Sequence, residues 1–126
     1  MKLLIVWMFL FAPLLSTASE LKNWNDLEPA IKYHTKFSVK FENGIELSAD
    51  TPLVLTEIYA GQSPVMYFEF YNLYCKDPNV TAEMVLVNPE PEDLTDDKSV
   101  GVLLDKDCKV GVYVEPRHYY NRSLLY

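Results

Sequence analysis

The two cysteines are the residues whose chemistry the sequence predicts most directly. Cys75 ends residues 65–75, an apolar and aromatic segment, and Cys108 begins the valine-rich residues 108–114. Two cysteines in an exported chain most simply form one disulfide; two free thiols or a bond to another chain are the alternatives. The two cysteines are 33 positions apart in the sequence, and closing a loop of that length would stabilise the folded state by about 3.5–4 kcal/mol. We therefore expect a Cys75–Cys108 disulfide that holds two sheets together.

The other reactive side chains form no recognisable catalytic or metal motif. His34 and His118 are the two histidines, and a disulfide would leave no thiolate to complete a zinc site with them. A Ser-His-Asp set can be assembled from the composition, but no nucleophile-elbow motif is present. Residues 88–99 are rich in acids but lack the EF-hand spacing, so we predict a solvated loop rather than a calcium site. We expect no enzyme activity, no metal and no cofactor.

Two asparagines match the signal for N-glycosylation. Asn79 and Asn121 each stand two positions before a threonine or serine, in Asn79-Val80-Thr81 and Asn121-Arg122-Ser123. Asn79 falls in a predicted turn, where its side chain could carry a glycan. The alternative is that either site is unused, because the tripeptide is common by chance.

Five tyrosines are candidate partner-binding residues. We expect them on the outer faces of strands or in the C-terminal segment: Tyr67, Tyr71, Tyr113, Tyr119 and Tyr120. Tyrosine supplies a large amphipathic contact area with few rotatable bonds, as binding surfaces require. The alternative is that these rings pack against one another or against the N-terminal segment.

The N-terminus and the charge indicate where the protein acts. Lys2, an apolar run and Ser16-Thr17-Ala18 predict a secretory signal peptide at 1–18, leaving residues 19–126 as a single secreted domain. The run is shorter than the about 20 residues of a membrane span, although an uncleaved anchor is the alternative. The formal net charge is −7, without a basic stripe. This balance argues against binding to nucleic acid or to an anionic membrane.

Alternation of apolar and polar residues predicts the elements that position these side chains. Apolar and polar residues alternate within residues 36–50, on both sides of Asn43-Gly44. This pattern is typical of a hairpin with a type I′ turn. Further strands are expected at 53–59, 66–71, 80–86, 100–104 and 108–114. Their expected core residues include Met66, Phe68 and Phe70, then Val80, Ala82, Met84 and Leu86, and finally Cys108, Val110, Val112 and Val114. Seven short strands without a long helix predict an all-β, antiparallel, immunoglobulin-like β-sandwich with one disulfide.

The parity of Cys75 conflicts with this pattern. Counted by twos from Phe68 and Phe70, Cys75 falls on the outer face, whereas Cys108 shares the face of the valines. A one-residue slip reverses every side chain of a strand. We therefore expect a bulge or the end of the strand near Asn72-Leu73 to turn Cys75 toward the core. The alternative is that Cys75 already lies in the following turn, where parity has no meaning.

The order of several segments is also informative. An apolar strand runs to Ala60-Gly61 and is followed by the strand Met66-Tyr67-Phe68-Glu69. Later come Val85-Leu86-Val87-Asn88-Pro89, an acidic and proline-rich loop, and Val102-Leu103-Leu104-Asp105-Lys106-Asp107-Cys108. This order resembles the C-terminal half of a zona pellucida module, although that family has more cysteines and Asn88 stands where one is expected. The resemblance implies an immunoglobulin-like sandwich with an extracellular interaction role.

These observations favour a secreted, non-enzymatic glycoprotein domain that binds an extracellular protein. The tyrosine-bearing sheet faces and residues 88–99 would form the contact surface. One alternative is a carrier that holds a small apolar ligand between the sheets. A cavity between Phe68/Phe70 and Val110/Val112 would favour the carrier, and a dry core would favour the binder. The other alternative is a structural component of the extracellular matrix that self-associates.

Overall fold

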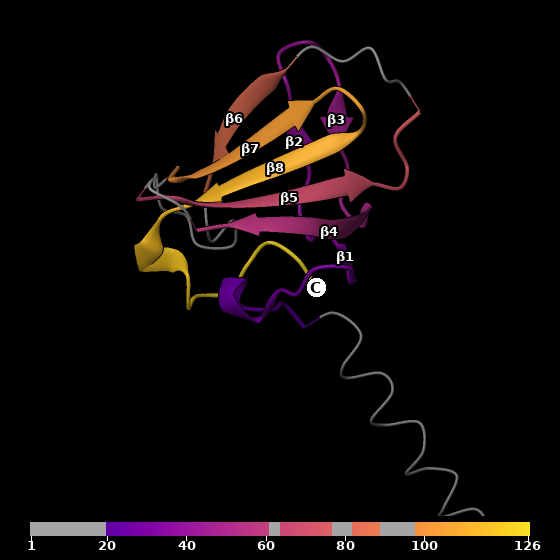
Figure 1. The fold of residues 1–126 in the computed structure, drawn as a ribbon. Coiled ribbons are helices and arrows are strands. Elements are labelled where there is room, and N and C mark those ends of the chain that lie inside the picture. The colour runs from indigo at the N-terminus through magenta and orange to yellow at the C-terminus, as the bar shows by residue number, and fades with distance from the viewer. Residues whose placement is uncertain (1–19, 61–63, 77–81, 89–97) are drawn as a thin grey trace, which may run out of the picture.

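A computed structural model describes residues 20–60, 64–76, 82–88 and 98–126. All strand pairs are antiparallel, and they form a six-stranded sheet of order β1-β4-β5-β8-β7-β6 and a two-stranded sheet β2-β3 (Figure 1). The elements are η1 (Trp24–Asp26), β1 (Lys32–His34), β2 (Val39–Lys40), β3 (Glu46–Leu47), β4 (Pro52–Tyr59), β5 (Met66–Asn72), β6 (Glu83–Val87), β7 (Val100–Asp105), β8 (Lys109–Val114) and η2 (Pro116–His118). The predicted all-β fold class is confirmed. The predicted signal peptide, residues 1–18, and the predicted glycosylation site Asn79 lie outside the described residues.

The core lies between the six-stranded sheet and a second, less regular layer. Phe68 and Phe70 on β5 are fully buried, as the alternation predicts. The second layer contributes buried side chains from the N-terminal segment, the β2–β3 hairpin and the C-terminal segment: Trp24, Leu27, Val39, Phe41, Leu47, Leu124 and Leu125. The rings of Trp24 and Phe68 lie 5.4 Å apart and join the two layers.

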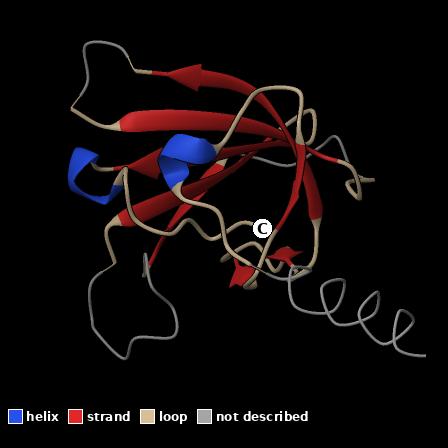
Figure 2. Ribbon diagram, turned by 90° about the horizontal axis from the view of Figure 1, so that it is seen from below, coloured by secondary structure: helices blue, strands red, loops and turns tan. Residues whose placement is uncertain are grey.

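The C-terminal segment lies between the N-terminal segment and β1. The amide of Lys22 donates to the carbonyl of Leu125, and His34 and Tyr126 exchange two backbone hydrogen bonds of 2.8 and 2.9 Å. At the other end of this segment, η1 and η2 lie at the same end of the sheet (Figure 2), where Asn25 N donates to Tyr119 O. The segment therefore covers the edge of β1 that would otherwise be open.

The β2–β3 hairpin is present, but its turn differs from the predicted type I′. Gly44 has φ of 88°, whereas Asn43 is not among the residues with positive φ. Gly44 N donates to Phe41 O, and Phe41 N donates to Ile45 O. These bonds define a three-residue loop with glycine in the left-handed position, the next most common hairpin type. The side chain of Asn43 accepts from Ile45 N at 3.0 Å, which stabilises this alternative.

The disulfide is confirmed, but it joins two neighbouring strands of one sheet rather than two sheets. Cys75 and Cys108 are bonded, with their Cα atoms 5.5 Å apart. The last residues of β5 pair with the first residues of β8, since Tyr71 lies opposite Lys109. Each cysteine lies just outside its strand, and the two therefore meet at the same end of the sheet.

The backbone around both cysteines explains the conflict in parity. β5 ends at Asn72, and Cys75 N donates to Asn72 O, so Cys75 follows a turn and no bulge is needed. The expectation that Cys108 points inward with the valines is wrong. Cys108 precedes β8, has φ of 62° and is half-buried.

The predicted core face of β6 is also wrong. Val85 and Val87 pack against the core, whereas Met84 and Leu86 are 49% and 56% exposed. The physical reason is Glu83. Its carboxylate accepts hydrogen bonds from the amides of Glu42 and Asn43 in the β2–β3 turn, so the first side chain of β6 is directed toward the second layer. Alternation then places Met84 and Leu86 outward. Ala82 is exposed ahead of the strand, and Val80 lies outside the described residues.

Candidate functional site: the outer face of the six-stranded sheet

Three tyrosines form a continuous row across three strands on the outer face. Tyr59 lies opposite Tyr67, and Tyr67 lies opposite Tyr113. The ring centroids are 5.7 Å apart for the first pair and 4.7 Å for the second. We call Tyr59, Tyr67 and Tyr113 the tyrosine row. Contacts of this kind stabilise sheets as cross-strand aromatic pairs.

A bulge in β4 places Tyr59 in this row. The register between β4 and β5 shifts between Leu55 and Glu57, and the hydroxyl of Thr56 donates to Glu69 O. Without that extra residue, Tyr59 would share the inward parity of Leu55. The same shift places Glu57 on the outer face, directly opposite Glu69.

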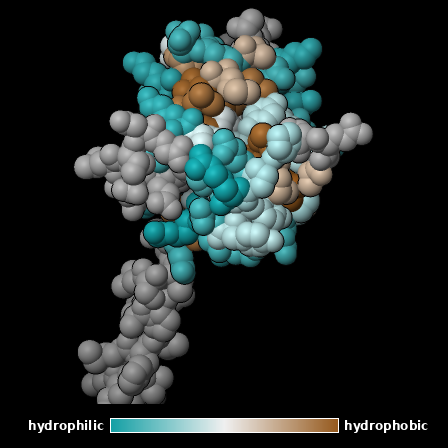
Figure 3. All heavy atoms as spheres, turned by 90° about the vertical axis from the view of Figure 1, so that its left-hand side faces the viewer, coloured by the Kyte–Doolittle hydropathy of each residue, from teal (hydrophilic) through white to brown (hydrophobic). Residues whose placement is uncertain are grey.

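Apolar side chains continue the surface beyond the row. Gly101 pairs with Tyr113 on one side and with Leu86 on the other, and Met84 pairs with Leu103. Since glycine has no side chain, the row meets the exposed Met84 and Leu86 without an intervening polar group. Figure 3, which views the side of the molecule that lies on the left in Figure 1, shows hydrophobic residues gathered near the top. The outer face therefore combines aromatic and aliphatic surface.

Two carboxylates lie beside the tyrosine row on this face. Glu57 and Glu69 are direct cross-strand neighbours, and within the described residues neither has an ion-pair partner. The hydroxyl of Tyr67 lies 3.4 Å from Glu69 Oε1. Burial of the phenol, together with the charge of Glu69, raises the pKa of Tyr67 to about 12. Tyr67 therefore stays neutral at physiological pH and adds no charge to the pair.

The predicted partner-binding tyrosines do not all lie together on one surface. Tyr67 and Tyr113 are in contact, and sequence reasoning missed Tyr59 because the bulge conceals its parity. Tyr71 is exposed on the same strand as Tyr67, but its neighbour on β8 is Lys109. Tyr119 and Tyr120 follow η2 and contact each other edge to face at 5.2 Å. Tyr119 packs against the core, while Tyr120 is 73% exposed.

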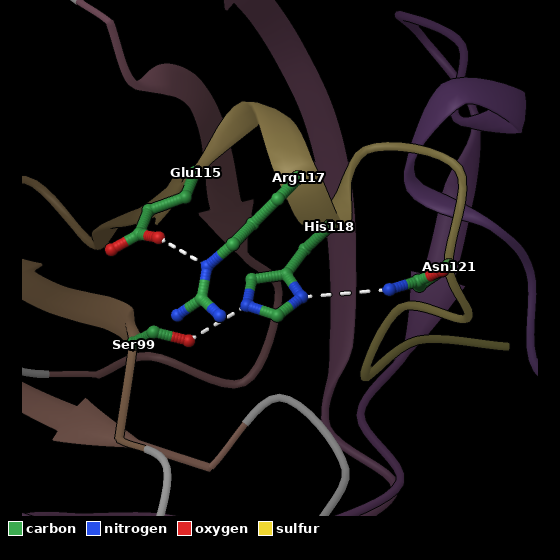
Figure 4. A network of polar contacts seen from close by, with 5 residues as sticks. All are labelled: Ser99, Glu115, Arg117, His118 and Asn121. Atoms are coloured by element: carbon green, nitrogen blue, oxygen red, sulfur yellow. Dashed lines mark hydrogen bonds and ion pairs between the residues drawn. The ribbon is translucent and has the colours of Figure 1, made fainter.

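On another part of the molecule, a cluster of polar side chains connects η2 to the start of β7 (Figure 4). Ser99 Oγ lies 2.9 Å from His118 Nε2, and Asn121 Nδ2 lies 3.5 Å from His118 Nδ1. Beside them Arg117 Nε donates to Glu115 Oε2 at 2.6 Å. A serine–histidine contact is also how a nucleophile and its base meet. Here, however, the imidazole is only 9% exposed, and its second nitrogen faces an amide rather than a carboxylate. The cluster is better suited to hold two segments together.

The same cluster bears on the second glycosylation signal. Asn121 is exposed, as glycosylation requires of the folded protein, but its Nδ2 atom, which would carry the sugar, faces His118. The serine of the tripeptide, Ser123, is buried and hydrogen-bonded to the backbone of Leu125. Use of Asn121 stays a prediction. Residues 89–97 of the predicted acidic contact loop lie outside the described residues.

Among the described residues, the interior offers little room for a ligand. Phe68 lies beside Val112, and Phe70 lies beside Val110, as neighbours on one sheet, so these residues are not the opposing faces that the carrier alternative requires. A cavity between the layers measures about 10 Å³ and has an apolar lining that includes Trp24, Leu47, Val112 and Leu124. Such a volume is about the minimum for one water molecule. Within the part of the chain that the structure describes, the indole Nε1 of Trp24 is buried without a hydrogen-bond partner.

The histidines and acids do not assemble into a metal site in the part of the chain that the structure describes. Within residues 20–60, 64–76, 82–88 and 98–126, no three His, Cys, Asp or Glu side chains come together as metal ligands would. His34 instead stacks on Tyr126, with ring centroids 5.6 Å apart. Among the same residues, no helix has the length and apolar character needed to cross a bilayer.

Comparisons with known proteins found no matching family model, no matching curated protein and no matching solved structure. The resemblance of residues 55–108 to the zona pellucida module therefore stays a prediction. Any inference about function depends on the surface geometry described above.

Proposed function

We propose that this protein is a secreted, non-enzymatic domain that binds another extracellular protein through the outer face of its six-stranded sheet. The tyrosine row is the observation that carries this proposal. Three rings, each in contact with the next, form a surface that is already ordered before a partner arrives. Ordered aromatic side chains lose little conformational entropy on binding, and tyrosine is enriched among the residues that dominate binding energy.

The aliphatic side chains beside the row support the same function. Met84 and Leu86 are about half exposed although each could have been buried by the opposite parity. Contiguous apolar surface of this kind on a folded domain is typical of an interaction site. The disulfide and the N-terminal signal support an extracellular location.

A comparison of two surface variants in a pull-down experiment tests the proposal. The double variant Tyr59→Ser/Tyr113→Ser removes two rings of the row, and Tyr74→Ser/Tyr120→Ser removes two exposed tyrosines elsewhere. Each tagged protein would be incubated with extracellular fluid, and the bound proteins quantified by mass spectrometry. We expect at least one protein bound by the wild type to be lost with the first variant and retained with the second. Equal binding by both variants, with both folded, would contradict the proposed surface.

The carrier alternative has a direct test of its own. A cavity of about 10 Å³ cannot hold an apolar ligand of ordinary size without a change in the fold. Native mass spectrometry of the secreted protein should therefore show the mass of the polypeptide and its glycans alone. A further bound mass that is removed by organic solvent would support the carrier.

A further inference from the structure

We infer that the partner presents an arginine side chain to a seat made by Glu57, Glu69 and the ring of Tyr67. This inference builds on the proposed function, because it names the chemistry of the partner at that face. We call these three residues the acidic seat. Its geometry comes from the bulge at Thr56, which sets the two carboxylates opposite each other and beside the tyrosine row.

The two carboxylates are arranged at a cost to the free protein. Like charges directly opposite each other on antiparallel strands destabilise the pair. The next position across the sheet from Glu69 is Gly111, which offers no side chain to neutralise it. Within the described residues no lysine or arginine forms an ion pair with either carboxylate. A cation from outside would remove the repulsion and gain two carboxylate partners.

The neighbouring rings favour a guanidinium over an ammonium group. Tyr59 and Tyr67 are stacked with centroids 5.7 Å apart, next to the carboxylates in the register. A planar guanidinium can stack on an aromatic face while its nitrogen atoms donate to carboxylates. An ammonium group can satisfy the charge but not the stacking. The seat thus fits arginine best.

Charge also favours a different, basic protein over a second copy of this chain as the occupant of the outer face. Two copies that met face to face would bring four carboxylates together, and the chain already has a net charge of −7. A basic partner is attracted by the same charge, and attraction of this kind raises association rates. The occupant of the outer face is therefore a basic, arginine-bearing extracellular protein.

A matched pair of peptides tests this chemistry. The probes are a synthetic peptide of alternating leucine and arginine, and the same peptide with citrulline, which keeps the shape of arginine but not its charge. Each is titrated into the isotope-labelled protein, and binding is followed by the amide chemical shifts. We expect the arginine peptide to shift the amides of Glu57, Tyr67 and Glu69 and to bind at least tenfold more tightly than the citrulline peptide.

Two double variants complete the test. Glu57→Gln/Glu69→Gln should remove the preference for arginine and should melt at the same or a higher temperature, since the repulsion is gone. Glu28→Gln/Glu46→Gln changes two exposed glutamates elsewhere and should keep the preference. Equal binding of both peptides to the tyrosine row would overturn the arginine inference but leave the proposed surface intact. Binding elsewhere, or no binding of the arginine peptide, would also overturn the inference, whereas the tyrosine variants decide the proposed function separately.

Discussion

The ring of Tyr67 lies over Gly111 on the neighbouring strand and occupies the space that a side chain there would need. A Cβ atom added to Gly111 would lie 2.5 Å from Tyr67 Cε1 and 2.7 Å from its hydroxyl oxygen. Atoms cannot approach so closely, so the glycine and the orientation of the tyrosine depend on each other. The tyrosine row can form because this one position has no side chain.

The first prediction concerns this contact. Gly111→Ala should displace the ring of Tyr67 and lower the free energy of unfolding by about 1–3 kcal/mol, as overpacking typically does. Gly101→Ala is the matched control on the same face, because its added Cβ would closely approach only Met84 Sδ, at 3.3 Å, and a methionine side chain is flexible enough to move aside. Urea unfolding measures both variants. A loss for Gly101→Ala as large as that for Gly111→Ala would contradict the specific role of the Tyr67 contact.

The raised pKa of Tyr67 predicts a dependence of stability on alkaline pH. The folded value is about 12, and an unfolded tyrosine ionises near its ordinary pKa of about 10. Below that value both states keep the proton, so the contribution to stability is complete. As the pH rises toward about 12 only the unfolded state loses the proton, so the free energy of unfolding falls.

Tyr67→Phe isolates this effect. The variant should lose the part of the decrease between about pH 10 and 12 that belongs to Tyr67, while other tyrosines still titrate. Ultraviolet absorbance of the phenolate, recorded against pH for the wild type and the variant, measures the missing titration. If the difference spectrum shows a midpoint near the ordinary value, the ring is not held against Glu69 as described.

Removal of the disulfide should be costly. Cys75→Ser/Cys108→Ser opens a loop with a sequence separation of 33. The loss of loop closure should lower the free energy of unfolding by about 3–4 kcal/mol, a large part of the about 5–15 kcal/mol typical of a domain. Chemical denaturation of the oxidised wild type and the double variant gives the difference. A difference below about 1 kcal/mol would show that the reduced chain is restrained in another way.

The contact between Ser99 and His118 should contribute to stability. Ser99→Ala removes the hydroxyl from His118 Nε2 and should cost about 0.5–1.5 kcal/mol, the typical net contribution of one hydrogen bond. Ser38→Ala, at an exposed position, is the control and should be nearly neutral. Thermal unfolding followed by circular dichroism compares them. Binding to the partner should be unchanged in both, since this cluster is not part of the tyrosine row.

Secretion and glycosylation can be tested by mass. We expect the secreted chain to begin at Ser19 and to carry a glycan on Asn79. The intact mass should fall on enzymatic deglycosylation, and Asn79→Gln should abolish most of that change. The variant Asn121→Gln reports separately on the second signal. A secreted wild type whose mass is unchanged by deglycosylation would rule out the glycan.

The sequence pattern predicts most of the strands, but it does not predict β1 (Lys32–His34) or which face of every strand is buried. Alternation identified Phe68, Phe70, Val110 and Val112 as core because their burial is the main energetic reason for these strands. It failed for β6, where both parities are apolar and the decision depends on Glu83 reaching the β2–β3 turn. Such a contact between residues distant in sequence has no local signature.

The candidate site was predictable only in part for a similar reason. Tyr67 and Tyr113 were found from strand parity, but Tyr59 depends on a bulge that follows from the pairing of β4 with β5. The cluster of Ser99 and His118 depends on how η2 folds back toward β7, which no short motif encodes. Tyr119 and Tyr120 are expected to start a last edge strand, but they follow the short helix η2 instead, and Tyr119 packs against the core.

The position of the disulfide determines what a protease would leave behind. Cys75 precedes β6 and Cys108 follows β7, so any single cut between these strands separates the two cysteines onto different polypeptides. The second polypeptide would contribute β7 and β8, which lie between β5 and β6 in the sheet. The cleaved protein would thus be a two-chain molecule whose halves share one sheet and one covalent bond, and the halves would separate on a reducing gel but not on a non-reducing one.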